Sequence, residues 1–255
     1  MALKASPEEQ ARLLDLQALD TKLQQLDHRA KNLPEVAQLV SLAAEAERLR
    51  VQRTRETGTV EDARTELKRV ESDVAVIEAR IARDEARLQA SSSVKDVAGL
   101  EHELAGLRRR HDELEDIELV VMEKLETLEN GVRVTAAEHA QALEAMTATA
   151  EARDAALTTI DEERAVNAAN RQAIAGAVSR ELLALYERQR ARYGLGASHL
   201  RGGVSSASGV KLLENEMAII RSAAPDDVLM CPDSQAVLVR TGESGLHGGA
   251  GSDSP

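Results

Sequence analysis

Few side chains in this sequence have the chemistry of a nucleophile or a metal ligand. The chain has one cysteine, Cys231, and six histidines, at positions 28, 102, 111, 139, 199 and 247. A cysteine attacks as its thiolate, so a catalytic thiol needs a neighbouring base or cation. The sequence places no histidine to activate Cys231, and it contains no phosphate-binding loop, dinucleotide fingerprint or metalloprotease helix. We therefore expect a protein that is not an enzyme, against the alternative of a hydrolase or transferase that uses Cys231.

The densest basic run is Arg108-Arg109-Arg110. Clustered arginines could contact a phosphate backbone or a partner protein. Five carboxylates follow, at positions 112, 113, 115, 116 and 118, so the run is better suited to salt bridges with a neighbouring helix. The net charge of −12 and the near absence of aromatic residues for base stacking also disfavour nucleic acid.

Composition and periodicity indicate the elements that must position these residues. The 255-residue chain is 43% hydrophobic and 30% charged, with no Trp, no Phe and two Tyr. This composition is typical of long helices and coiled coils. Apolar residues recur at alternating spacings of three and four, which lays a narrow seam along one helix face. In the first arm the clearest seam residues are Leu16, Leu19, Leu23, Leu26, Ala30 and Leu33, then Val60, Ala63, Leu67, Val70, Val74, Ile77, Ile81 and Leu88.

The predicted fold is mainly α, with a long antiparallel coiled-coil hairpin over residues 1–193. Pro34 predicts a break between two helical pieces, because proline fits only the first turn of a helix. Ser91-Ser92-Ser93 predicts the turn of the hairpin, near 91–96. The second arm then continues from Val97 as far as Leu185. Gly58 and Gly131 are weak points of the two arms, since glycine costs a helix about 1 kcal/mol relative to alanine.

Two polar residues fall on the seam. Asp84 should meet a basic residue across the seam or lie where the two helices of the coiled coil begin to diverge, because a buried carboxylate is costly unless it is paired. His111 could set the register or respond to pH, or could simply be partly exposed.

Beyond Tyr193 the character of the chain changes, and glycines and serines interrupt helix formation. We expect a small α+β module over residues 194–241 and a disordered Gly/Ser-rich tail over 242–255. Within the module, Glu214 to Ser222 predicts a short helix. Asp227–Met230 and Ala236–Thr241 predict a β-hairpin.

The chain resembles a bacterial family that joins an antiparallel coiled-coil hairpin to a C-terminal C4-type zinc ribbon. The resemblance covers nearly the whole length and rests on the order and spacing of several short motifs. They are His28-Arg29-Ala30 with Leu33-Pro34, Leu100-Glu101-His102-Glu103-Leu104 with Leu114-Glu115-Asp116, Glu181-Leu182 with Leu185-Tyr186-Glu187 and Arg190, and Pro225-Asp226-Asp227-Val228 with Val237-Leu238-Val239-Arg240.

In that family two Cys-x-x-Cys knuckles hold one zinc ion. The resemblance places the four ligand positions at Ser205, Ser208, Cys231 and Ser234. One thiolate and three hydroxyls cannot hold structural zinc. We therefore expect a degenerate ribbon with no metal and no other cofactor, held by apolar packing or loosely ordered. The alternative is a site in which His199 or His247, with Asp233, assembles around Cys231.

The resemblance implies a non-enzymatic adaptor, scaffold or chaperone-like factor, since similar proteins are linked to flagellar assembly, secretion machinery or RNA. We expect protein partners on the coiled coil and the tail, with RNA binding through the tail and Arg108, Arg109 and Arg110 as the alternative. A single cysteine and the lack of a long apolar run predict a cytoplasmic protein without a membrane segment. The same heptads allow a monomeric hairpin or a dimer of hairpins.

Overall fold

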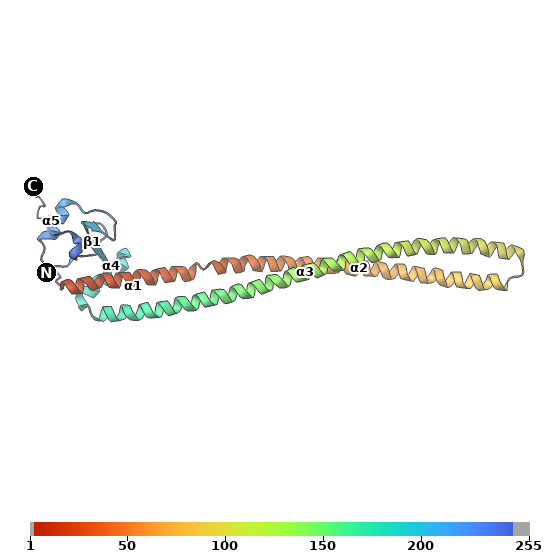
Figure 1. Ribbon diagram of the computed structural model, residues 1–255, viewed down its shortest axis with the longest axis horizontal. Coiled ribbons are helices and arrows are strands. Elements are labelled where there is room, and N and C mark those ends of the chain that lie inside the picture. Colours follow the sequence, from red (N-terminus) through yellow and green to blue (C-terminus); the bar gives the residue numbers. More distant parts are fainter. Residues whose placement is uncertain (1–2, 247–255) are drawn as a thin grey trace, which may run out of the picture. The chain divides into compact units, whose positions relative to one another are not determined.

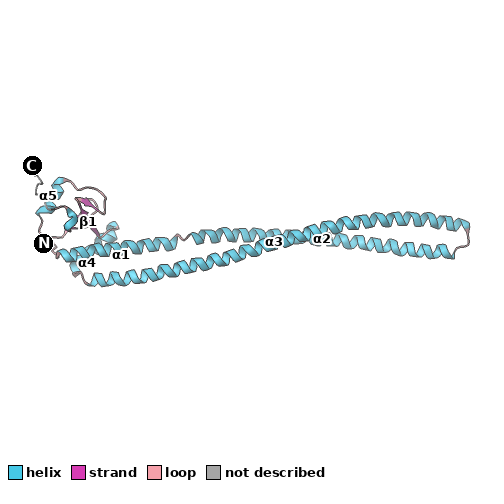
Figure 2. Cartoon of the chain, viewed as in Figure 1, coloured by secondary structure: helices cyan, strands magenta, loops and turns pink. Residues whose placement is uncertain are grey.

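The structure is a computed structural model that describes residues 3–246 (Figure 1). Helices dominate it, and the strands are confined to the C-terminal part of the chain (Figure 2). The elements in chain order are α1 (Pro7–Lys31), α2 (Pro34–Ala90), α3 (Val94–Gly176), α4 (Arg180–Tyr193), β1 (Ala197–Arg201), β2 (Val204–Ser205), α5 (Glu214–Ser222), β3 (Leu229–Met230), β4 (Val237–Val239) and the 3-10 helix η1 (Gly242–Ser244). Within the described residues they form two compact units, residues 34–153 and residues 3–33 with 154–246.

The unit of residues 34–153 consists of α2 paired with the first part of α3. The helices are antiparallel: Arg64 of α2 pairs with Glu129 of α3 at 2.7 Å, and Arg108 of α3 pairs with Glu85 of α2 at 2.8 Å. Ser91–Ser93 form the connecting turn, as predicted, and the Ser93 hydroxyl accepts the amide of Asp96 at 3.4 Å. The predicted antiparallel coiled-coil hairpin is thus confirmed.

Asp84 departs in one respect from the prediction. It is buried on the seam, and it is paired with basic residues of its own helix: Arg87, with 3.1 Å between Nη1 and Oδ1, and Arg80, with 4.0 Å between Nε and Oδ2. The expected partner across the seam is not needed because arginines one turn away in either direction reach the carboxylate. Arg80 also bonds Glu103 of α3, so the pairing still links the two helices.

The other unit contains α1 and the last part of α3, which run side by side (Figure 1). Leu26 and Leu33 pack against Ile160, and Lys22 pairs with Glu163 at 3.4 Å. The helix α1 begins with a capping box in which Ser6 and Glu9 satisfy each other's backbone amides. It ends at Lys31, and α2 begins at Pro34, which confirms the predicted break.

The second arm is shorter than the sequence predicted. The helix α3 ends at Gly176, and α4 is a separate helix that begins after Ser179. Glycine is a weak helix former, and the Ser179 amide is held by the Glu9 carboxylate at 3.0 Å, so the chain leaves the coiled coil here. Leu182 and Tyr186 of α4 are fully buried in a core that includes Leu13, Leu16, Ala197, Val237 and Val239. The predicted boundary at 193/194 therefore does not separate α4 from the tail, because α4 shares the core of the tail.

The tail module is a four-stranded sheet in the order β2-β1-β4-β3. The strands β1 and β4 pair in parallel and the other neighbours are antiparallel. The helix α5 has the predicted bounds, and β3 and β4 lie within the two predicted β-prone runs. The strands β1 and β2 were missed. Gly202 and Gly203 connect them with φ values of 55° and 79°, the conformation of a tight hairpin turn that glycine adopts freely.

The described chain also continues past the predicted end of the module. Gly242–Ser244 form η1, and the buried Ser244 hydroxyl donates to the Leu200 carbonyl at 2.7 Å. The predicted disordered tail is therefore wrong for residues 242–246, because this hydrogen bond and the packing of Leu246 on the core around Leu200 hold them. Residues 247–255 lie outside the described residues.

Among residues 3–246, no helix combines the length and apolar character required to span a bilayer.

Candidate functional site

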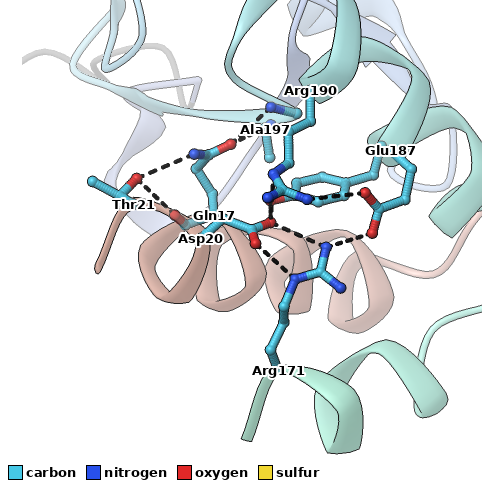
Figure 3. Close-up of polar contacts among 9 residues, drawn as sticks. Gln17, Asp20, Thr21, Arg171, Glu187, Arg190 and Ala197 are labelled. Atoms are coloured by element: carbon cyan, nitrogen blue, oxygen red, sulfur yellow. Dashed lines mark hydrogen bonds and ion pairs between the residues drawn. The ribbon is translucent and has the colours of Figure 1, made fainter. Parts of the chain in front are cut away.

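A buried carboxylate, Asp20, joins three helices at the end of the unit that carries the tail module (Figure 3). Arg171 of α3 donates to it through Nε at 2.6 Å and Nη2 at 3.2 Å, and the Tyr186 hydroxyl of α4 donates at 2.7 Å. Arg190 of α4 lies 3.1 Å from the same carboxylate, measured from Nε to Oδ2. Glu187 in turn holds both arginines. We call Asp20, Arg171, Tyr186, Glu187 and Arg190 the Asp20 junction.

One turn before Asp20, Gln17 extends the junction to the sheet. Its side-chain carbonyl accepts the amides of Gly196 at 2.7 Å and Ala197 at 3.3 Å, and its amide group donates to Thr21 at 3.2 Å (Figure 3). The start of β1 is thereby tied to α1. Polar groups buried in this way must be paired, so these contacts orient the tail module on α1.

The pKa shifts of the junction residues indicate a structural role. Burial, followed by the hydrogen bond to Asp20, raises the pKa of Tyr186 far above its ordinary value. The hydrogen bond to Asp20 also raises the pKa of Arg171. A tyrosine that keeps its proton and an arginine that keeps its charge are poor proton-transfer groups, so the arrangement favours stability over catalysis.

Sequence reasoning singled out three of the five junction residues. Tyr186, Glu187 and Arg190 are among the motif residues of the resemblance, although no role was assigned to them. Asp20 and Arg171 were missed, because each is one charged residue among many on a helix. The available signal was the position of Asp20 directly after the seam residue Leu19, where it lies close to the neighbouring helix.

Three of the four predicted ligand positions, Ser205, Cys231 and Ser234, meet in a small polar centre of the tail module. The buried Cys231 thiol donates to the Ser205 hydroxyl at 3.2 Å, and Ser205 lies 2.7 Å from the Ser198 hydroxyl. Ser234 also hydrogen-bonds the Cys231 thiol. Ser208 instead accepts the amide of Val210 at 3.3 Å, within its own turn.

The polar centre lowers the pKa of Cys231. Burial raises the pKa of this thiol, but hydrogen bonds with Ser205, with Ser234 and with the backbone of Ser234 and Asp233 lower it by more, so the pKa lies below its ordinary value. The side chain has no solvent exposure, which denies a substrate access to the sulfur. The ring of His199 lies 2.8 Å from the Thr241 hydroxyl and so is engaged away from the thiol. His247 lies outside the described residues.

This donor set does not fit zinc. Structural zinc requires four strong donors, usually thiolates or imidazoles, whereas three of these positions carry neutral hydroxyls. The hydroxyls of Ser205 and Ser198 and the Cys231 thiol satisfy one another instead. The centre is therefore complete as a hydrogen-bonded cluster.

Arg240 makes a second set of hydrogen bonds that stabilises the tail module. Its guanidinium donates to the carbonyls of Ile220, Ala223, Ala224, Pro225 and Asp227 at 2.7–3.4 Å. Burial lowers the pKa of Arg240. The segment between α5 and β3 thus surrounds one side chain, and both Arg240 and the Pro225–Val228 segment are among the motif residues of the resemblance.

The basic run on α3 is largely paired. Arg108 reaches Glu85 of α2, as predicted for an interhelical salt bridge, and Arg110 pairs with Glu113 of its own helix at 3.0 Å. All three arginines are exposed. Two of the three charges are therefore partly neutralised, which weakens this run as a phosphate contact.

His111 lies half-buried on the seam between carboxylates of both helices. Nε2 lies 3.4 Å from Glu78 of α2, and Nδ1 lies 3.4 Å from Glu115 and 4.0 Å from Asp112. The ligand atoms of His111, Asp112 and Glu115 lie within 4.8 Å of one another, but the carboxylates are exposed. Such a cluster is common on an acidic helix surface.

Together these features define an antiparallel coiled-coil hairpin protein that carries a small α+β tail module. The chain belongs to the CT398-like coiled coil hairpin domain family, whose model matches residues 16–194. The uncharacterized protein Rv2229c of Mycobacterium tuberculosis is 36% identical over 241 residues, which cover 93% of this chain and 98% of the relative.

Two solved structures are similar. A protein from Mycobacterium smegmatis is 34% identical, with a TM-score of 0.76 over 93% of this chain and all of its own. CT398 from Chlamydia trachomatis is 18% identical, with a TM-score of 0.56 over 91% of this chain and 97% of its own, which shows the shared fold.

Proposed function

We propose that this protein is a non-enzymatic interaction factor of the cytoplasm that acts as an adaptor or scaffold through its coiled-coil hairpin. The observation that carries the proposal is the pairing of α2 with α3 in residues 34–153. A two-helix seam leaves most of each helix surface exposed, which suits protein binding better than the enclosed pockets used by small-molecule chemistry. Val40, Val76 and Val134 are large apolar side chains on this surface, and they are 51–69% exposed.

We propose further that the tail is a ribbon-derived module that has lost its metal. The hydroxyl-rich donor set around Cys231 supports this view, and so do the five hydrogen bonds of Arg240, which fasten the same module without a metal. Metal binding supplies much of the folding energy of small zinc modules. Here the apolar core shared with α1 and α4 takes that role.

Photo-crosslinking tests the interaction role. A photoreactive amino acid is placed at Val40 or Val76 on the hairpin, and at Ile219 on the tail, in the full chain inside cells. Discrete protein adducts at the hairpin positions are the expected result. Adducts with RNA alone, or no adduct at any position, would contradict it. The unsubstituted chain under the same light is the control.

Elemental mass spectrometry on protein purified without a histidine tag tests the loss of zinc. We expect no zinc in the natural chain and about one ion per chain in a variant with four cysteines. That variant is made by changing Ser205, Ser208 and Ser234 to Cys. Stoichiometric zinc in the natural chain would overturn this proposal.

A further inference from the structure

Residues 117–122 of α3 contain more apolar side chains than the coiled coil requires. Ile117, Leu119, Val120 and Met122 are 44–64% exposed, and only Val121 of the run enters the seam. A two-helix coiled coil needs two apolar residues in seven, so the additional apolar residues do not serve the pairing of α2 with α3. Exposed apolar side chains gathered on one stretch of helix indicate contact with another molecule.

Leu119 and Met122 line a groove of about 330 Å³ along the hairpin. They are three residues apart and therefore lie on one face of the helix. The floor of the groove includes the half-buried seam residues Leu67 of α2 and Leu125 of α3. The groove thus offers four apolar side chains from two helices, which suits the apolar face of a third helix.

The rim of the same groove is acidic. Glu123, Glu126 and Glu129 line it, and no lysine or arginine does. Glu129 is paired with Arg64, whereas within residues 3–246 the carboxylates of Glu123 and Glu126 have no ion-pair or hydrogen-bond partner. An apolar floor with unpaired carboxylates at its edge is complementary to apolar side chains flanked by cations.

We propose that the groove at Leu119 and Met122 docks a basic amphipathic helix of a partner protein. The inference rests on the proposed interaction role and names the chemistry of the partner. A second copy of this chain is a poorer occupant, because it carries a net charge of −12 and would bring like charges to an acidic rim.

The test uses the full chain and a fluorescein-labelled helical peptide with leucines along one face and lysines on both flanks. Binding is measured by fluorescence anisotropy at about 0.15 M salt, where distant surface charges are largely screened. One variant of the protein combines Leu119→Ser with Met122→Ser, and another combines Glu123→Gln with Glu126→Gln. Leu143→Ser is the matched control, since Leu143 is 46% exposed and lies 21 residues, three heptads, after Met122.

We expect the variant with Leu119→Ser and Met122→Ser to weaken binding at least about tenfold, as is typical when central interface residues are truncated. The variant with Glu123→Gln and Glu126→Gln should weaken binding less and reduce its salt dependence, because charges at the rim of an interface act mainly on the rate of association. Leu143→Ser should bind as tightly as the natural chain, and a peptide with glutamates in place of the lysines should not bind. Circular dichroism of each variant verifies that the helices are intact.

Equal binding by the groove variants and the natural chain would overturn the proposal and indicate general attraction to an acidic surface. Self-association that is lost on changing Leu119 and Met122 would overturn it in favour of a second copy. If the peptide does not bind the natural chain while crosslinked partners are still found on the hairpin, the groove assignment fails and the interaction role stands. If no partner crosslinks anywhere on the hairpin, the interaction role itself fails.

Discussion

Asp20→Asn should loosen the unit that carries the tail module. The substitution keeps the volume of the side chain but removes the charge that Arg171 and Arg190 share. Breaking a buried ion pair costs about 3–5 kcal/mol. The two guanidiniums are 22% and 30% exposed and recover part of their hydration, so we expect about 3 kcal/mol, near the lower limit of that range.

Hydrogen exchange with mass spectrometry is the suitable assay, because the chain has two compact units and need not unfold in one step. A loss of 3 kcal/mol corresponds to exchange about 100-fold faster. The increase should appear in α4 and in β4, whereas amides of residues 60–90 in the other unit should be unchanged. Asp27→Asn is the matched control, since Asp27 lies on the same helix and pairs with Arg164 while 58% exposed. An exposed pair contributes at most about 1 kcal/mol, so exchange should rise less than about fivefold.

Tyr186→Phe separates the hydroxyl from the rest of the junction. It removes one donor to a charged acceptor, which costs about 1.5–3 kcal/mol, and leaves both arginines in place. Combined with Asp20→Asn, the two losses should be less than additive, because both act on the same hydrogen bond: one removes its donor and the other the charge of its acceptor. If Asp20→Asn exchanges its amides as slowly as the natural chain, Asp20 does not stabilise this unit. The same conclusion follows if residues 60–90 exchange faster by the same factor as α4 and β4.

Two further predictions concern glycine and pH. Gly58→Ala should stabilise α2 by about 0.5–1 kcal/mol in urea unfolding, since an added Cβ meets no atom within 4 Å. Gly196→Ala should destabilise the tail module, because its Cβ would lie 2.4 Å from the Tyr186 ring. The opposite signs would contradict the packing described. The backbone amides of Ser6 and Ser179 lower the pKa of Glu9, so its contribution is complete above about pH 4.5 and is lost as the pH falls through the lower folded value. Glu9→Gln should flatten the acid side of the stability profile, and an unchanged profile would argue against this role.

Much of the hairpin was predictable because its signal is repetitive. The heptad pattern is repeated many times along each arm. The arms, the break at Pro34 and the turn at Ser91–Ser93 could therefore be predicted from spacing and composition. The end of α3 at Gly176 was not predictable in this way. Apolar residues continue at heptad spacing beyond Gly176 through Leu182 and Leu185. These two leucines pack in the core that α4 shares with the tail module, so the spacing alone does not show that the coiled coil has ended.

The polar sites were less accessible to sequence reasoning. Ser205 and Cys231, two of the four ligand positions implied by the resemblance, are hydrogen-bonded to each other, although their residue types suggested no hydrogen-bond pattern. Asp20 and Arg171 lie 151 residues apart, and nothing in the local sequence pairs them. Only the antiparallel register of α1 and α3 does so, and the register depends on the packing of the seam residues.

The architecture of β4 explains how a tail module this small can fold around the Cys231 thiol and the hydroxyls of Ser205 and Ser198. Val237 and Val239 enter the core shared with α1 and α4, while Leu238 enters the core of Cys231, Leu200, Met217 and Ile220. Alternate residues of one strand thus join two apolar clusters, as the two faces of a strand allow. It follows that the tail module needs α1 to fold: deletion of residues 1–33 should unfold β4, whereas Cys231→Ser, which removes the last thiol, should leave the sheet in place.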